Sequence, residues 1–305
     1  MGPVLVIAGP TAVGKSRLAV DVAERVGAEI VSADSRQLYR GLDIGTAKPS
    51  EEDRARVPHH LVDVLEPDVT YSAGRFRDDF EEAIAELEDR GVPAVVVGGS
   101  TLYVEALVRG LADLPPLPET LLAELTETAQ TPEGRARLYA ELQEADPEAA
   151  STLDPSKSQR LVRLVGLLRL TGRRPSALWR ERHLPPVPHT LVVLDRPRDE
   201  LYDRVNRRVG QMMEAGLEEE VRRLYSRSDE VRRLLRATIG YREIVGALEG
   251  EHDLQAAVHL IQRNSRRYAK RQWTWYRRYE DALWLDARTA TAESVLDAVA
   301  PWPSR

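Results

Sequence analysis

The segment GPTAVGKS at residues 9–16 restricts the fold of this 305-residue chain more than any other feature. It follows the apolar run at 4–8 and precedes an amphipathic stretch, so a buried strand, a glycine-rich loop and a helix are expected in that order. Loop amides and a helix N-terminus in this arrangement form a concave anion site. The pattern therefore predicts a diphosphate site, whose residues are Gly9, Pro10, Thr11, Ala12, Val13, Gly14, Lys15 and Ser16.

Two residues of this loop have expected roles. Lys15 should reach the outer phosphate, and the Ser16 hydroxyl should ligate Mg2+. Kinases, nucleotide hydrolases and switch proteins share such a loop, so the loop alone does not identify the reaction.

Short apolar runs alternate with longer amphipathic segments along the chain. The apolar runs are 4–9, 29–34, 94–99 and 191–195, and helices are expected at 15–26 and 75–90. This alternation predicts an α/β fold, with a P-loop NTPase-like parallel sheet that is doubly wound and flanked by helices.

The alternation stops between about residues 114 and 188, where paired prolines border a run of helical patterns. We expect an inserted all-helical subdomain at 114–188. The α/β core, with a helical C-terminal part, is then made of residues 1–113 and 189–305.

Composition narrows the class of protein. The chain has no cysteine, so neither disulfides nor thiolate zinc sites are possible. Its apolar runs are far shorter than the roughly 20 residues of a membrane-spanning helix, and no signal peptide is evident, so a cytoplasmic location is expected.

Charge is distributed unevenly. The first 150 residues hold 14 Lys and Arg against 28 Asp and Glu, whereas the remainder holds 29 against 21. A polyanion would bind the basic half, although solvated helical faces explain many arginines equally well.

Polar groups follow each expected strand. They are the glycine-rich loop, Asp34 with Ser35, the segment 98–101, and Asp195 with Arg196. Ligands of open α/β sheets bind beyond the carboxyl ends of the strands, so these groups should converge on one cleft. Asp34 and Asp195 compete for the acidic role there, and their spacing does not separate them.

Several longer motifs together resemble the tRNA dimethylallyltransferase family over nearly the full length. Besides the glycine-rich loop, the matching segments are VSADSRQLYRGLDIGTAKPS at 31–50, PHHLVDVLEP at 58–67, YSAGRFRDD at 71–79, VVVGGSTLY at 95–103, DPSKSQRLVR at 154–163, IGYREIV at 239–245 and AKRQWTWYRR at 269–278.

The resemblance implies a reaction. A dimethylallyl group would pass from dimethylallyl diphosphate to N6 of the adenine at position 37, adjacent to the anticodon on its 3′ side, giving N6-isopentenyladenosine and pyrophosphate. The resemblance makes Asp34 the general base and assigns catalytic roles to Lys15 and Arg208, with Mg2+ at Ser16. A general base suits this alkyl transfer because an adenine amino group is a poor nucleophile until it loses a proton.

The resemblance also implies that the inserted subdomain at 114–188 binds tRNA and that the protein contacts the anticodon stem-loop. We expect a monomer. Ser100 would lie close to the accepting nucleotide. The other implied contacts are Asp34, Ser35, Arg36, Gln37, Ser158, Gln159, Arg160, Leu161, Val162 and Arg163. From the residues alone, Arg160 and Arg163 could equally form a solvated helix face. For 263–279 we expect the aromatic residues in the core and most arginines facing RNA.

Other functions compete with this interpretation. An isopentenyltransferase acting on free adenine nucleotide would need no tRNA-binding surface, which argues against it here. A P-loop kinase of a small metabolite would leave the motifs at 34–39 and 45–49 unexplained. A nucleotide-dependent switch or binding module predicts no turnover with an allylic diphosphate.

Overall fold

The structure is a computed structural model that describes residues 2–112, 114–154, 158–181 and 184–302. The chain divides into two units, a larger one made of Met1–Arg109 with Val187–Arg305, and a smaller one made of Gly110–Pro186.

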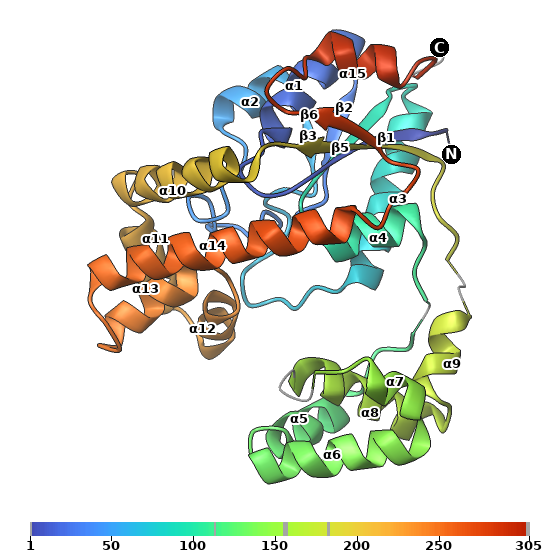
Figure 1. Cartoon of the computed structure of the whole chain (residues 1–305), viewed down its shortest axis with the longest axis vertical. Helices are drawn as coiled ribbons and strands as arrows, with labels where there is room; N and C mark the ends of the chain where they lie inside the picture. The colour runs from blue at the N-terminus through green and yellow to red at the C-terminus, as the bar shows by residue number, and fades with distance from the viewer. Residues whose placement is uncertain (1, 113, 155–157, 182–183, 303–305) are drawn as a thin grey trace. The chain divides into compact units, whose positions relative to one another are not determined.

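The larger unit contains a six-stranded parallel sheet in the order β3-β2-β4-β1-β5-β6 (Figure 1). This confirms the predicted α/β fold with a P-loop NTPase-like sheet. The strands are β1 Val4–Ala8, β2 Glu29–Ser32, β3 His59–His60, β4 Ala94–Val97, β5 His189–Asp195 and β6 Leu283–Asp286. The sequence did not predict β3 and β6, because β3 has two residues and β6 exposes part of its apolar surface.

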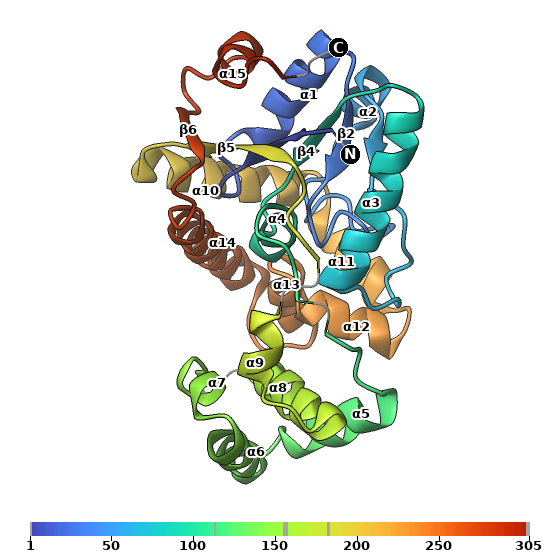
Figure 2. The ribbon, with the colours of Figure 1, turned by 90° about the vertical axis from the view of Figure 1, so that its right-hand side faces the viewer.

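Both faces of the sheet are buried, as the continuous apolar runs predict. In β1, Val6 and Ala8 point to one core while Leu5 and Ile7 point to the other. The helices lie on both sides of the sheet (Figure 2). The core around Leu5 includes α1 Lys15–Val26 and α15 Ala292–Ala298, and the core around Val6 includes α3 Ala73–Asp89, α4 Thr101–Val108 and α14 Leu254–Tyr276.

The C-terminal part of the larger unit is mostly helical, as predicted, and α14 is its longest helix. Helix α14 packs on α10 and α13. The remaining helices of the unit are α2 Glu51–Arg56, α10 Arg198–Glu214, α11 Leu217–Tyr225, α12 Asp229–Arg236 and α13 Tyr241–Leu248.

The smaller unit is all-helical and has its own core. Its helices are α5 Glu119–Thr128, α6 Pro132–Ala145, α7 Pro147–Ser151, α8 Ser158–Thr171 and α9 Pro175–Arg180. The Asp146 carboxylate is buried and accepts hydrogen bonds from the amides of Ala149 and Ser176, so one side chain caps α7 and holds the start of α9. In the described residues of both units, no helix is long and apolar enough to cross a membrane.

Candidate active site

Two adjoining cavities in the larger unit contain the residues that follow β1, β2 and β4. The loop cavity, of about 80 Å³, is lined by Lys15 and Ser16 of the glycine-rich loop and by Gly98 and Gly99 after β4. The helix cavity, of about 220 Å³, has an apolar wall from α10 and α14. Both cavities are lined by Thr11, Asp34, Thr46, Arg208 and Tyr268.

Helix α10 brings two guanidinium groups to the glycine-rich loop. Arg204 donates from Nε to the Ala12 carbonyl at 2.7 Å, and Arg208 donates to Thr11 Oγ1 at 3.4 Å. Lys15 donates from Nζ to the Pro10 carbonyl at 2.8 Å. Three cationic side chains of α1 and α10 therefore contact the loop itself.

Burial disfavours the charged form of Lys15. Burial, with a smaller contribution from the charge of Arg208, lowers the pKa of Lys15 to about 7, while Asp34 opposes the shift. Burial also lowers the pKa of Arg208, again opposed by Asp34. An anion bound beside these groups would stabilise their charged forms, which is the electrostatic condition expected of a diphosphate site.

Asp34 reaches the boundary of the two cavities because β2 and β4 end close together. The Asp34 carboxylate accepts a hydrogen bond from the Arg36 amide at 2.9 Å, and the Ser35 amide donates to Ser100 Oγ at 2.8 Å. A Cβ on Gly98 would lie 2.1 Å from the Ala33 carbonyl oxygen, so only glycine allows this approach. The hydrogen bond between Ser35 and Ser100 thus joins the ends of β2 and β4 directly beside the Asp34 carboxylate.

Asp195, the competing aspartate, is engaged elsewhere. Its Oδ1 accepts hydrogen bonds from Trp273 Nε1 and from the Arg196 amide, both at 2.8 Å. Within the described residues it lines neither cavity. The geometry therefore brings Asp34 to the glycine-rich loop and gives Asp195 a contact with α14.

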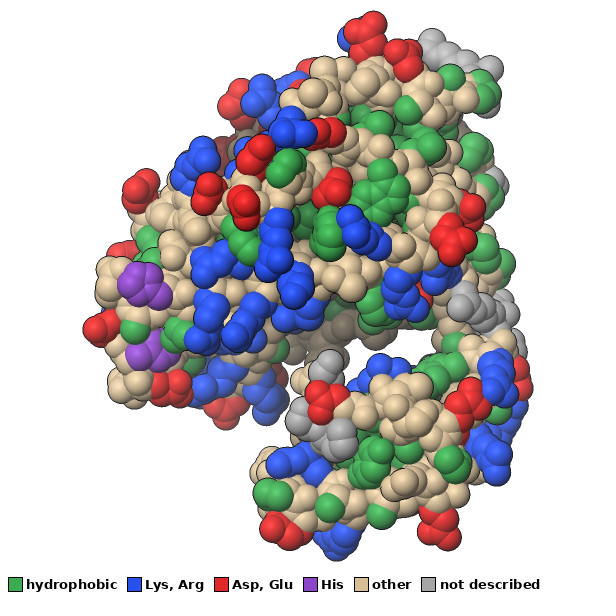
Figure 3. Space-filling model, viewed as in Figure 1, with side chains coloured by type: hydrophobic (Ala, Val, Ile, Leu, Met, Phe, Trp, Pro, Cys, Tyr) green, Lys and Arg blue, Asp and Glu red, His purple; other side chains and the backbone are tan. Residues whose placement is uncertain are grey.

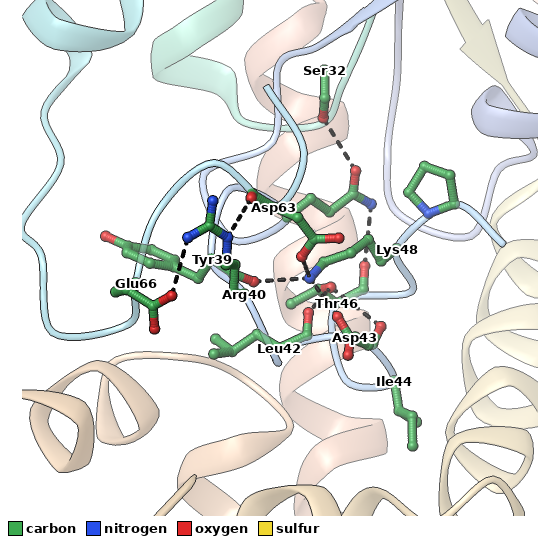
Figure 4. Close-up of polar contacts among 12 residues, drawn as sticks. Ser32, Tyr39, Arg40, Leu42, Asp43, Ile44, Thr46, Lys48, Asp63 and Glu66 are labelled. Atoms are coloured by element: carbon green, nitrogen blue, oxygen red, sulfur yellow. Dashed lines mark hydrogen bonds and ion pairs between the residues drawn. The ribbon is translucent and has the colours of Figure 1, made fainter. Parts of the chain in front are cut away.

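A buried lysine holds the segment that follows β2. The Lys48 side chain is 2% exposed, pairs with Asp43 and Asp63, and donates to the Tyr39 carbonyl (Figure 4). Gln37 lies in the same network, where its amide donates to the Ala47 carbonyl at 3.1 Å. These contacts fix the backbone of the GTAKP motif beside the cavities.

Glu220 of α11 fixes the other side of that motif. Its carboxylate accepts hydrogen bonds from the amides of Asp43, Ile44 and Gly45, at 3.0, 2.9 and 3.2 Å. It also accepts from the Tyr241 hydroxyl at 2.7 Å, and Glu220 is 2% exposed. Four donors thus converge on one buried carboxylate.

The predicted tRNA-contacting residues fall into two groups. Ser35, Arg36 and Ser100 line the helix cavity together with Asp34, and Gln37 lines the loop cavity. The second group, residues 158–163, begins α8 in the smaller unit.

Within α8 the side chains have different surroundings. Gln159 and Arg160 are exposed, whereas Leu161 and Val162 are buried in the core of the smaller unit. Arg163 is half-buried and donates to the Leu114 carbonyl at 3.3 Å. Arg160 is therefore the most available cation of this group.

A basic surface covers α14, where Lys and Arg side chains gather (Figure 3). The aromatic residues at the end of this helix are at least partly buried, and Tyr276 is fully so. This burial agrees with the expected position of the aromatic residues against the core, whereas contact between the arginines and RNA stays a prediction. The exposed cations are Arg263, Arg267, Lys270, Arg271, Arg277 and Arg278.

The sequence did not single out two cavity residues of α14, Tyr268 and Gln272. Both lie on the stripe of the helix that also carries the buried Tyr276, at intervals of four residues. A glutamine on an apolar stripe of a helix must find hydrogen-bond partners inside the protein. This position of Gln272 could have marked it in the sequence as a residue with buried polar contacts.

Comparisons with known proteins give consistent results. The sequence model of the IPP transferase family matches residues 37–279. A tRNA dimethylallyltransferase of Thermotoga neapolitana is 44% identical over 290 residues, which cover 95% of this chain and 94% of that protein. One of Salinibacter ruber is 42% identical over 298 residues, with 97% and 92% covered.

Solved structures are similar as well. The full-length tRNA isopentenylpyrophosphate transferase of Bacillus halodurans superposes with a TM-score of 0.70 at 35% identity, covering 98% of this chain and 94% of that one. A eukaryotic dimethylallyltransferase acting on tRNA superposes with a TM-score of 0.78 at 27% identity, covering 98% and 77%.

The Glu220 contacts lead to a stability prediction. Glu220→Gln replaces one carboxylate oxygen by an NH2 group that faces N–H and O–H donors, so the free energy of unfolding should fall by about 2–3 kcal/mol. Urea denaturation followed by tryptophan fluorescence measures this change. Glu219→Gln, at an exposed position of the same helix, is the matched control. Equal unfolding midpoints for the two variants would contradict the role of Glu220.

Proposed function

The chain belongs to the IPP transferase family and is a prenyltransferase that acts on tRNA; from this premise we propose its donor, its target atom and the residues that perform the transfer. The donor is dimethylallyl diphosphate, and the acceptor is N6 of the adenine at position 37, so the products are N6-isopentenyladenosine and pyrophosphate. The observation that carries this proposal is the position of Asp34, which lines both the loop cavity and the helix cavity.

The loop cavity suits the leaving group. The glycine-rich loop offers amides and a helix N-terminus to the diphosphate, and Lys15 and Arg208 add positive charge beside them. As the bond between C1 and the diphosphate oxygen breaks, charge develops on the departing pyrophosphate. The groups around the loop stabilise that charge.

Asp34 suits the acceptor. The adenine N6 forms a bond to C1 of the dimethylallyl group, and its proton passes to the Asp34 carboxylate, which is accessible from the helix cavity. An adenine in the anticodon loop must leave its stack to reach this position. Ser35, Arg36 and Ser100 line the same cavity and can contact the extruded nucleotide.

The site also fits Mg2+. In the described part of the chain no group of three acidic, histidine or cysteine residues could hold a metal by itself. Mg2+ commonly takes few protein ligands and relies on phosphate oxygens of the substrate, so the Ser16 hydroxyl in the loop cavity suits it. When bound, the ion would neutralise charge on the diphosphate.

The two proposed RNA-contacting surfaces are α8 in the smaller unit and the basic surface of α14. Phosphate contacts by exposed arginines supply most of the affinity of such surfaces and make it salt-dependent. The monomeric state and the cytoplasmic location stay predictions.

A pair of aspartate variants tests the proposed mechanism. Asp34→Asn should slow single-turnover transfer from radiolabelled dimethylallyl diphosphate to tRNA by about 10²-fold or more, because the proton acceptor is lost. Asp195→Asn is the matched control, since asparagine retains an oxygen that can accept from the Trp273 indole. Pyrophosphate should still inhibit Asp34→Asn. A normal rate in Asp34→Asn, or an equal loss in Asp195→Asn, would contradict the assignment.

An arginine pair tests tRNA contact by the smaller unit. Arg160→Ala should weaken tRNA binding and reduce the slope of log affinity against log salt by about 1, because one phosphate contact is lost. Filter binding over a salt series measures both quantities. The control is Arg173→Ala, which removes an exposed arginine already paired with Glu181. If the two variants bind tRNA equally well, Arg160 is not a contact.

A further inference from the structure

Gln272 of α14 joins two loops of the active site through a single buried side chain. It is 2% exposed. Its Oε1 accepts a hydrogen bond from the Thr11 amide at 2.9 Å, and its Nε2 donates to the Gly99 carbonyl at 2.6 Å. One carboxamide therefore bridges the glycine-rich loop after β1 and the turn after β4.

Only a carboxamide of this length can make both contacts. The Thr11 partner is a donor and the Gly99 partner is an acceptor, so the two ends of the amide have fixed orientations. Glutamate could not donate to a carbonyl, methionine could do neither, and asparagine is one methylene shorter. A Cβ on Gly99 would lie 2.6 Å from Gln272 Nε2, so any larger residue at this position would displace the Gln272 amide.

The two hydrogen-bond partners of Gln272 belong to loops with different proposed roles, one beside the leaving group and one beside the acceptor. Thr11 belongs to the loop that would hold the leaving pyrophosphate, and its hydroxyl also accepts from Arg208. Gly99 precedes Ser100, whose hydroxyl accepts from the Ser35 amide next to Asp34. A chain of contacts thus links the glycine-rich loop to the residues beside Asp34, and its first link is the side chain of Gln272.

The supporting helix is itself fixed to the sheet. The next residue, Trp273, donates to Asp195 at the end of β5. Tyr276, one turn further on, is fully buried in the core. Helix α14 is therefore anchored at three strand ends, those of β1, β4 and β5, and Gln272 makes two of these contacts.

We propose that Gln272 is a positioning residue for the transfer, which sets the leaving pyrophosphate relative to Asp34 and the acceptor. This inference rests on the proposed function. Gln272 acts through Thr11 and Gly99 and takes no proton. Without it, the amide of Thr11 and the carbonyl of Gly99 lose their partner, and the two loops can shift independently. A misplacement of reacting groups by about 1 Å can cost about 10²-fold in rate.

The test is the single-turnover rate constant for transfer from radiolabelled dimethylallyl diphosphate to tRNA with enzyme in excess. A smaller folded fraction leaves this rate constant unchanged as long as folded enzyme remains in saturating excess over tRNA, whereas misplacement lowers it. Gln272→Met should lower the rate constant by about 10²-fold and leave the Kd for tRNA unchanged. Gln255→Met makes the same substitution at an exposed position of α14 and should behave as the unaltered protein.

A second variant approaches the same bond from its other partner. Gly99→Ala should push the Gln272 amide away and slow transfer as well, so it carries the test if Gln272→Met does not fold. The double variant should be no slower than the slower single variant, because both remove one bridge.

Two results would overturn the inference. One is a rate constant in both single variants within about twofold of the unaltered protein, with only thermal stability reduced, which is the outcome of a purely structural role. The other is no transfer to tRNA by the unaltered protein, which would overturn the proposed function together with this inference.

Discussion

The carboxyl ends of β2 and β4 meet so closely that Gly98, the first residue after β4, has no room for a side chain. A Cβ at Gly98 would collide with the Ala33 carbonyl, and one at Gly99 would collide with the Gln272 amide. Because these collisions are absent, the glycine-rich loop, Asp34 and Ser100 can line a common pair of cavities. The active site is thus a property of three strand ends packed at backbone distance, and the surrounding helices supply the charges.

Electrostatics explains why such a site favours a diphosphate over a neutral ligand. Lys15, Arg204 and Arg208 all contact the glycine-rich loop, and Asp34 is the carboxylate that lines both cavities. Burial keeps the pKa of Lys15 near 7, so keeping the Lys15 ammonium charged in the free site costs free energy. A bound diphosphate offsets that cost. In the proposed transfer the same charges would favour the departure of pyrophosphate as a leaving group.

The sequence predicted the elements whose signals are local and missed those that depend on tertiary contacts. The apolar runs and the motif at 9–16 were enough to predict the four central strands and the loop between β1 and α1. The bridge from Thr11 to Gln272 spans 261 positions, and the bond from Asp43 to Glu220 spans 177, so no local pattern could reveal either. Both Asp34 and Asp195 follow apolar strands, so the choice between them needed the resemblance. The structure shows how they differ, because the Trp273 indole donates a hydrogen bond to the Asp195 carboxylate.

The central claim is that the cavity beside Asp34 transfers a dimethylallyl group to a tRNA adenine. The most direct measurement incubates the protein with radiolabelled dimethylallyl diphosphate and Mg2+, offering unmodified tRNA and AMP as parallel acceptors, followed by nucleoside analysis of the products. The account predicts label in tRNA alone, recovered as N6-isopentenyladenosine. Label in AMP would point to a nucleotide prenyltransferase, and label in neither acceptor would contradict the account.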